Sequence, residues 1–298
     1  MTAIQVRGLT KHRRGRGRVV DDVSFDVARG RVCALLGPNG SGKTTILRMM
    51  VGLTRGSGST YFDGRRFLDL PTPRKYVGAA LAPAPFHPGR RVSSHLRMVA
   101  AASALPPERV DAVLDETGLT EYARAPIKAL SLGLKQRLSI ANAIIGDPAI
   151  LLLDEPTNGL DPASAVWFRD YLRFVASNGT TVLVSSHHLR EADAYAHDVV
   201  ILDAGRVRAA GPVAALRAAH SADRPVNVRT EARQRLTDLV VRHGGHVVAG
   251  ADASLQVHGL SAAAIGGLAA AYRVPLDELT PEVVTLEDIV HAVSQRLS

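Results

Sequence analysis

The sequence is poor in cysteine and aromatic residues and contains no long apolar segment. A single cysteine, Cys33, occurs in 298 residues, which excludes an intrachain disulfide bond. No apolar run approaches the ~18 residues that a helix needs to cross a bilayer, and residues 1–6 lack the apolar region of a secretory signal. We therefore expect a soluble, cytosolic chain whose association with any membrane would depend on a partner.

Lysine is also scarce, although the net charge is +8. Only five of the 36 basic residues are lysines. A basic surface can attract nucleic acid or anionic lipid, but scattered arginines can equally form a solvated surface. The densest basic segment, residues 12–18, has no interleaved aromatic residues on which bases could stack. We therefore expect no nucleic-acid partner.

The most informative segment that is present is residues 37–44, GPNGSGKT. It matches the phosphate-loop pattern G-x-x-x-x-G-K-[ST] at every fixed position, between an apolar strand at 32–36 and a helix that starts near residue 45. Glycines let backbone N–H groups turn toward a phosphate chain, and the helix N-terminus adds a fixed positive end. The sequence therefore predicts binding of a nucleoside triphosphate together with Mg²⁺. The predicted binding residues are Gly37, Pro38, Asn39, Gly40, Ser41, Gly42, Lys43, Thr44 and Thr45.

Individual side chains have distinct predicted roles. Lys43 would reach the β- and γ-phosphates, and Thr44 would place its hydroxyl on Mg²⁺. A second motif, Asp154-Glu155, follows the apolar strand at 150–153 and so lies at the carboxyl end of the sheet, where α/β proteins bind ligands. We expect Asp154 to hold Mg²⁺ and Glu155 to polarise the water that attacks the γ-phosphate. The alternative is that two acidic residues merely end a strand.

Further motifs follow in a fixed order along the chain. They are LSLGLKQR at 130–137, NGLD at 158–161 and SSH at 185–187. Together with the phosphate loop and the Asp154-Glu155 pair, they resemble the ATP-binding subunits of ABC transporters over roughly the first 215 residues. More narrowly, the chain is similar to ATPases that pair with separate permeases, including bacterial antibiotic-resistance exporters. The segment at 279–288 also resembles the tail of that subgroup.

This resemblance implies a division of labour between two subunits. Ser131 and Gly133, at a helix N-terminus, would contact the γ-phosphate of ATP held by the opposite subunit. Asp161 would belong to the D-loop, and His187 would hydrogen-bond the γ-phosphate. Two ATP molecules would be sandwiched in a homodimer that closes on binding and reopens on hydrolysis. The resemblance implies a separate transmembrane permease as partner and a peripheral location on the cytoplasmic face of the cell membrane.

The chain departs from the family pattern at three places. Leu132 and Leu134 replace a glycine and a glutamine of the signature, although Ser131 and Gly133 remain. Ala82 stands where the family has a glutamine that senses Mg²⁺ and touches the permease. The adenine-stacking aromatic residue expected near residues 12–14 is absent; Arg13 or Arg14 could stack on the base instead, and a merely solvated loop is the alternative.

The apolar pattern predicts two domains. Alternating apolar strands and helices over residues 1–219 indicate an α/β P-loop NTPase core with a mostly parallel sheet and a helical subdomain. Residues 220–298 show the order βαββαβ, which is typical of a small α+β accessory domain of the split-βαβ type. The leading interpretation is an exporter ATPase. A soluble ABC ATPase that acts on nucleic acid or ribosomes, and a regulatory module without turnover, are the alternatives.

Overall fold

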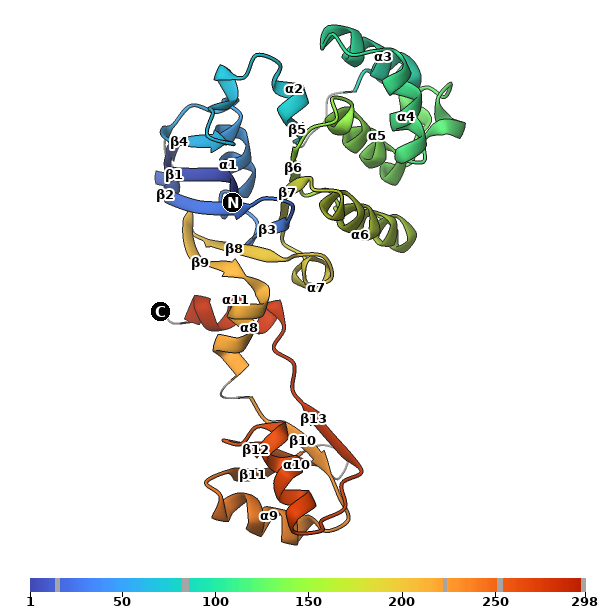
Figure 1. The fold of residues 1–298 in the computed structure, drawn as a ribbon. Helices are drawn as coiled ribbons and strands as arrows, with labels where there is room; N and C mark the ends of the chain where they lie inside the picture. Colours follow the sequence, from blue (N-terminus) through green and yellow to red (C-terminus); the bar gives the residue numbers. More distant parts are fainter. Residues whose placement is uncertain (14–16, 82–85, 222–223, 251–253, 296–298) are drawn as a thin grey trace. The chain divides into compact units, whose positions relative to one another are not determined.

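The structure is a computed structural model that describes residues 1–13, 17–81, 86–221, 224–250 and 254–295. Contacts within the chain divide it into two compact units. The first contains residues 1–213 together with the end of the last helix, and the second contains residues 214–292. Figure 1 shows the elements of each unit along the chain.

A six-stranded sheet forms the centre of the first unit. Its strand order is β5–β6–β7–β3–β8–β9; the first five strands are parallel, and β9 runs antiparallel to β8. Every residue of β3, β6 and β7 is buried, as expected for parallel strands that are covered on both faces. The mostly parallel α/β core predicted from the sequence is confirmed. The strands are β3 (Val32–Leu36), β5 (Val77–Ala80), β6 (Ile150–Asp154), β7 (Thr181–Ser186), β8 (Asp198–Asp203) and β9 (Arg206–Pro212).

Helices and a second sheet cover this central sheet. An antiparallel sheet of order β2–β1–β4 and helix α1 lie on one side of β6 and β7, and helices α5 and α6 lie on the other (Figure 1). The core on the α1 side contains alternate residues of the central strands, such as Cys33 and Leu35 of β3, because successive side chains of a strand point to opposite faces. The outer strands are β1 (Thr2–Arg13), β2 (Gly17–Ala28) and β4 (Ser57–Phe62). The helices are α1 (Lys43–Met50), η1 (Phe67–Asp69), α2 (Pro73–Tyr76), α3 (Val92–Ala102), α4 (Glu108–Glu116), η2 (Thr120–Tyr122), η3 (Ile127–Ala129), α5 (Leu132–Ile144), α6 (Pro162–Ser177) and α7 (Leu189–Asp193).

Capping residues mark the predicted helix ends. Ser131 caps α5, because its hydroxyl accepts a hydrogen bond from the Leu134 amide at 3.2 Å. Helix α6 ends at Ser177 with Asn178 as its C-cap, and Gly179 follows with φ of +91°. The prolines between residues 71 and 88 favour exposed, extended backbone in this segment. The expected exposure is wrong for β5. Its four residues form a mostly buried strand because they pair with β6, a contact that no local pattern shows.

The second unit contains a four-stranded antiparallel sheet of order β11–β12–β10–β13. Strand β12 lies between β10 and β11, which confirms the predicted split-βαβ arrangement. Alternate residues of β10 and β12, such as Val228 and Val257, are buried with residues of α9 and α10. The apolar pattern near residues 274–279 favours a last strand in this segment. That strand begins at Glu278, and Pro275 before it has no N–H to donate to a ladder. The elements are α8 (Val213–Ser221), β10 (Val226–Arg229), α9 (Arg233–Arg242), β11 (His246–Ala249), β12 (Leu255–His258), α10 (Ala262–Ala271), β13 (Glu278–Pro281) and α11 (Leu286–Gln295).

Candidate nucleotide-binding and hydrolysis site

Three neighbouring strands bring the predicted site residues to one edge of the central sheet. The phosphate loop follows β3, the Asp154-Glu155 pair ends β6, and His187 follows β7. In the parallel registers, Leu36 pairs with Ser186 and Asp154 pairs with Ser185. The carboxyl ends of these strands therefore meet at one place, where α/β proteins bind their ligands.

The phosphate loop turns sharply before α1. Gly42, the residue before the helix, has φ of +104°, and a Cβ there would lie 2.7 Å from the Val19 carbonyl oxygen. Only glycine fits this close approach in a left-handed conformation. The first amides of α1 are thereby presented at the loop as donors, and the helix dipole adds positive potential for an anion.

The buried Lys43 side chain stabilises the phosphate loop through hydrogen bonds to its backbone. This side chain is only 5% exposed, and its Nζ donates to the carbonyl oxygens of Gly37 at 2.7 Å and Pro38 at 3.2 Å. The same ammonium lies 3.1 Å from Glu155 Oε1. A cavity of about 450 Å³ opens beside it, and its lining includes residues 39–40 and 42–45, Glu155, and Arg18 on β2. This cavity has the size and the donor groups for a nucleotide.

Thr44 and Asp154 form a polar pair that fits Mg²⁺. The Thr44 hydroxyl donates to Asp154 Oδ1 at 3.1 Å. Asp154 is 2% exposed, and in the described part of the chain its Oδ2 is buried without a hydrogen-bond partner. A hydroxyl and a carboxylate oxygen are ligands that Mg²⁺ prefers, with its remaining ligands drawn from phosphate and water. The described residues contain no cluster of three or more His, Cys, Asp or Glu that could hold a metal by itself.

Glu155 sits between Lys43 and His187. Its Oε2 accepts a hydrogen bond from His187 Nδ1 at 2.8 Å, while its Oε1 faces Lys43. Its φ is +47°, a left-handed conformation that is strained for a residue with a side chain. The structure thus places the two residues predicted to be catalytic, Glu155 and His187, in direct contact with each other, and Glu155 also contacts Lys43 of the phosphate loop.

Ser131, Gly133 and Asp161 form a separate group at the N-termini of α5 and α6. The Asp161 side chain caps α6 by accepting from the Ser164 amide at 2.9 Å, and this hydrogen bond lowers the pKa of the Asp161 carboxyl. A Cβ at Gly133 would lie 2.7 Å from Ser164 Oγ, so the two helix ends touch. Among the described residues that line the 450 Å³ cavity, none belongs to this second group.

Two residues with contacts at the site were not predicted, and the side chains of three positions named from the sequence are not described. Ser185 is fully buried, donates to Asp154 Oδ1 at 2.7 Å and accepts from the Glu155 amide at 2.8 Å. Arg18 reaches the cavity from β2. Ala82 and Arg14 lie outside the described residues, and the described part of Arg13 does not include its side chain.

We predict that Ser185→Ala will slow ATP turnover more than it weakens ATP binding. The change leaves the Glu155 amide without its acceptor and removes one of the two hydroxyls that donate to Asp154 Oδ1. This costs about 1–3 kcal/mol, so we expect kcat to fall roughly tenfold with KM for ATP nearly unchanged. Ser186→Ala is the matched control, because the Ser186 hydroxyl accepts from the His188 amide and contacts neither carboxylate in the described hydrogen bonds. Equal kinetics of the two variants would contradict this role.

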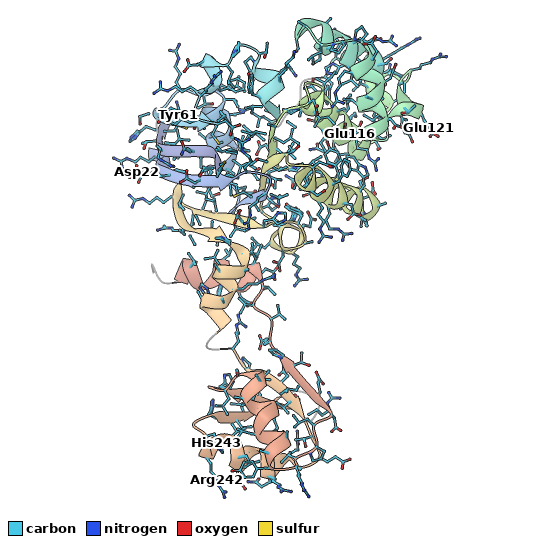
Figure 2. All side chains as sticks on the ribbon, viewed as in Figure 1. Asp22, Tyr61, Glu116, Glu121, Arg242 and His243 are labelled. Atoms are coloured by element: carbon cyan, nitrogen blue, oxygen red, sulfur yellow. The ribbon has the colours of Figure 1, made fainter. Side chains whose placement is uncertain are left out.

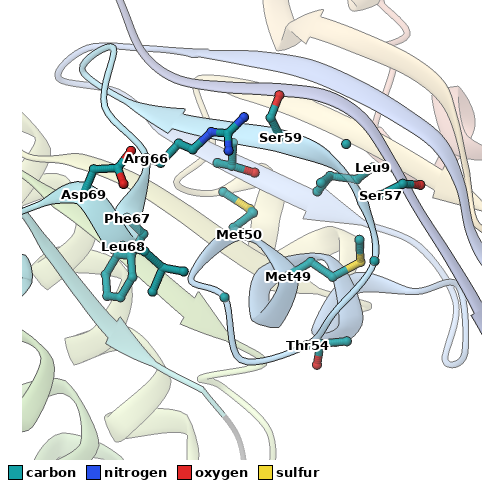
Figure 3. Close-up of a pocket in the computed structure, with 14 residues that line it drawn as sticks. Leu9, Met49, Met50, Thr54, Ser57, Ser59, Arg66, Phe67, Leu68 and Asp69 are labelled. Atoms are coloured by element: carbon teal, nitrogen blue, oxygen red, sulfur yellow. The ribbon is translucent and has the colours of Figure 1, made fainter.

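A second cavity lies away from these motifs. It measures about 240 Å³ and is lined by the end of α1, by β4 and by η1, with Met49, Met50, Ser59 and Phe67 around it (Figure 3). None of the residues predicted for the site lines it. This cavity is therefore separate from the predicted nucleotide site.

The fold and the geometry together define a P-loop nucleotide-binding protein, and comparisons with known proteins specify its family. The family model described as "ABC transporter" matches residues 20–158. The chain is 39% identical over 210 residues to the uncharacterized ABC transporter ATP-binding protein YdbJ of Bacillus subtilis, covering 69% of this chain and 68% of the relative. It is 33% identical over 196 residues to the lantibiotic transport ATP-binding protein SrtF of Streptococcus pyogenes, covering 65% of this chain and 84% of the relative.

The chain belongs to the ABC transporter ATP-binding proteins, and it is an ATPase of that family. A solved structure titled as the ATP binding subunit of an ABC transporter matches with a TM-score of 0.65 and 30% identity, over 73% of this chain and 93% of that chain. Residues 224–287 match a family described only as "Domain of unknown function (DUF8746)". The resemblance inferred from the motifs is thereby confirmed for the first unit.

Proposed function

We propose that this protein is the ATP-hydrolysing subunit that powers export by a separate membrane permease. Two copies would close on two ATP molecules and reopen after hydrolysis. The observation that carries this proposal is the division of the motifs within one chain. One group holds the phosphates and the hydrolytic carboxylates, and the other presents Ser131, Gly133 and Asp161 at two helix ends outside that cavity. A second copy would complete each site.

Each residue has a role that follows from its contacts. Lys43 and the loop amides bind the phosphates, and Glu155 orients and deprotonates the attacking water with His187 held against it. Thr44 and Asp154 would hold Mg²⁺, which, when bound, neutralises charge on the phosphate oxygens. Ser131 and the α5 N-terminus would meet the γ-phosphate of the ATP on the other copy.

Export is favoured over import by the relatives. SrtF is named as a lantibiotic transport protein, and a relative from Cupriavidus metallidurans, 38% identical over 218 residues, is named Nod factor export ATP-binding protein I. No helix among the described residues is long and apolar enough to cross a membrane. We propose a peripheral position on the cytoplasmic face of the membrane, held there by the permease, with residues 220–298 as an accessory domain.

The test of this function begins with the reading frames next to its gene, where the proposal expects a polytopic membrane protein, and continues with co-expression of the two proteins. The chain is expected to sediment with membranes only when that protein is present, and the reconstituted pair is expected to hydrolyse ATP faster than the chain alone. Sedimentation with ribosomes or stimulation by DNA, together with no response to the membrane protein, would replace the proposal by the non-transport alternative.

We further propose that Arg18 faces the nucleobase in place of the missing aromatic residue. It is the one cavity-lining cation besides Lys43 among the described residues, and Asp21 Oδ1 holds it at 2.6 Å. Asp21 also pairs with Arg206, and both arginines lower the pKa of its carboxyl, Arg18 the more strongly. A guanidinium fixed in this way offers a flat surface for a base.

This placement predicts a base-dependent loss of affinity. Arg18→Ala is expected to weaken ATP binding roughly fivefold, the value of a stacked guanidinium, while binding of inorganic tripolyphosphate stays the same. Arg18→Lys keeps the charge but loses the plane, so it should behave like the alanine variant. Calorimetry with both ligands checks this. Equal weakening for ATP and tripolyphosphate would show that Arg18 acts on the phosphates instead.

A further inference from the structure

A stacked pair, Arg137 and Trp167, connects helix α5, which begins in the signature motif, with helix α6, which follows the D-loop. The Arg137 guanidinium carbon on α5 lies 4.1 Å from the centre of the Trp167 ring on α6. Both side chains are half-buried, and the Arg137 Nη1 also donates to the Thr117 carbonyl oxygen at 3.4 Å. A cation over an indole face is the most favourable cation–π arrangement.

A second aromatic ring also packs against Trp167. The Tyr171 ring stacks on it at 5.3 Å with an interplanar angle of 16°. The Tyr171 hydroxyl donates to Glu116 Oε1 of α4 at 3.2 Å, and Glu116 lies 3.7 Å from Arg109. Figure 2 labels Glu116 among the side chains around α4. The indole therefore contacts a cation from α5 and a ring of its own helix α6 that is hydrogen-bonded to α4, so three helices of the first unit restrict its orientation.

The same two helices touch a second time at their N-termini. Gly133 packs against Ser164, as its close approach to Ser164 Oγ shows. Arg137 stands six positions after the cap Ser131 (137 − 131), and Trp167 stands six positions after the cap Asp161 (167 − 161). At 1.5 Å per residue, the stacked pair lies about 9 Å from each cap. Two contacts separated along stiff helices fix both the distance and the rotation between them.

Electrostatics links the stacked pair to the D-loop. Burial lowers the pKa of the Arg137 guanidinium, and the nearby Asp161 carboxylate opposes that shift. The positive charge of Arg137 therefore lies within the field of the residue that caps α6. The stacking of Arg137 on Trp167 and the attraction between Arg137 and Asp161 therefore both stabilise the packing of α5 against α6.

We propose that Arg137 and Trp167 are positioning residues that hold the N-termini of α5 and α6 as one body. Ser131 and Asp161 then meet the ATP of a second copy together rather than one after the other. This inference rests on the proposed ATP-driven homodimer. It adds that the contact between Arg137 and Trp167 within each chain sets the ATP concentration at which the dimer closes.

The test measures ATP-dependent dimer formation by size exclusion in the Glu155→Gln background. Adding Trp167→Leu or Arg137→Gln is expected to raise the ATP concentration for half-maximal dimer at least fivefold, because each dimer loses two such contacts. Trp167→Phe keeps an aromatic ring and should recover most of the loss. Phe174→Leu and Arg169→Gln are the matched controls: both residues lie on α6, Phe174 is 57% exposed and Arg169 pairs with Asp170.

Two further measurements separate positioning from folding. ATP binding to monomers, at protein concentrations too low for association, should be the same in all variants, because the phosphate loop is intact. Trp167 is the only tryptophan of the chain, so the emission of Arg137→Gln reports directly on loss of the stacked cation and is expected to change. The emission of Arg169→Gln should not change.

The outcomes discriminate between the two proposals. If Glu155→Gln alone fails to dimerise with ATP, the homodimer itself is refuted. If it dimerises, and the Trp167→Leu and Arg137→Gln variants dimerise at the same ATP concentration, the positioning role is refuted while the homodimer stands. A Trp167→Leu variant with reduced ATP binding as a monomer would show a general loss of structure. It would also overturn the inference, unless Arg137→Gln still raises the ATP concentration for half-maximal dimer and Trp167→Phe still recovers most of the loss.

Discussion

Glu155→Gln abolishes ATP turnover and leaves a stable ATP-bound dimer: this is the expected result with the largest effect on catalysis. The amide keeps the shape of the side chain beside His187 but cannot take a proton from water. Loss of a general base costs about 10²–10⁴-fold in rate, so kcat should fall to that extent. ATP binding should persist, because Lys43 and the loop amides are unchanged. Phosphate release and size-exclusion chromatography with ATP measure the two effects.

The control for this variant is Glu121→Gln, a carboxylate on the exposed surface of the first unit (Figure 2). It removes the same charge without touching the loop, so its turnover should equal that of the native chain. Undiminished hydrolysis by Glu155→Gln would refute the assignment of Glu155 as the base. Asp154 and His187 would then be the remaining candidates at the ends of β6 and β7.

Lys43→Met is expected to have the largest effect on binding. The buried ammonium is the one lysine in the phosphate loop, and its charge-assisted hydrogen bonds are each worth about 1.5–3 kcal/mol. Two such bonds to phosphate correspond to a loss of ATP affinity of at least about 100-fold. Fluorescent-ATP titration measures it. Methionine keeps an unbranched side chain that ends one atom short of the ammonium, so little packing is lost.

Two comparisons guard this prediction. Lys75→Met removes an exposed lysine of α2 and should bind ATP as the native chain does. Because Lys43 also neutralises Glu155 at 3.1 Å, the double variant with Glu155→Gln shows whether the loss comes from an unpaired buried carboxylate. Native affinity in Lys43→Met would mean that the nucleotide is bound elsewhere.

The phosphate loop and the Asp154-Glu155 pair could be predicted because each is a local pattern with fixed spacing. Residues 37–44 carry their own turn and helix start, and a strand ending in two carboxylates points to the edge of a parallel sheet. The cap Ser131 is equally local, since its hydroxyl bonds an amide three residues along the same chain. Such features need no knowledge of which strands pair.

Ser185 and Arg18 could not be predicted because their roles depend on pairing between distant segments. Ser185 meets Asp154 only because β7 lies beside β6 in register. Arg18 enters the cavity because β2 passes the loop, with the Val19 carbonyl packed against Gly42 and Gly205. Strand β5 was missed for the same reason, since prolines around it suggested extended surface and its partner β6 lies some 70 residues further along the chain.

The measurement that tests the account most directly is complementation between two inactive variants. Lys43→Met removes the lysine with which the loop binds phosphate. Ser131→Arg blocks the helix end that would complete the partner's site. In a mixed dimer, the intact loop of one copy faces the intact Ser131 of the other. The account predicts that each variant alone is inactive and that an equimolar mixture recovers about a quarter of native ATPase activity, from random pairing in a twofold dimer. A mixture no more active than its two components, or full activity of Ser131→Arg alone, would contradict a site built from two copies.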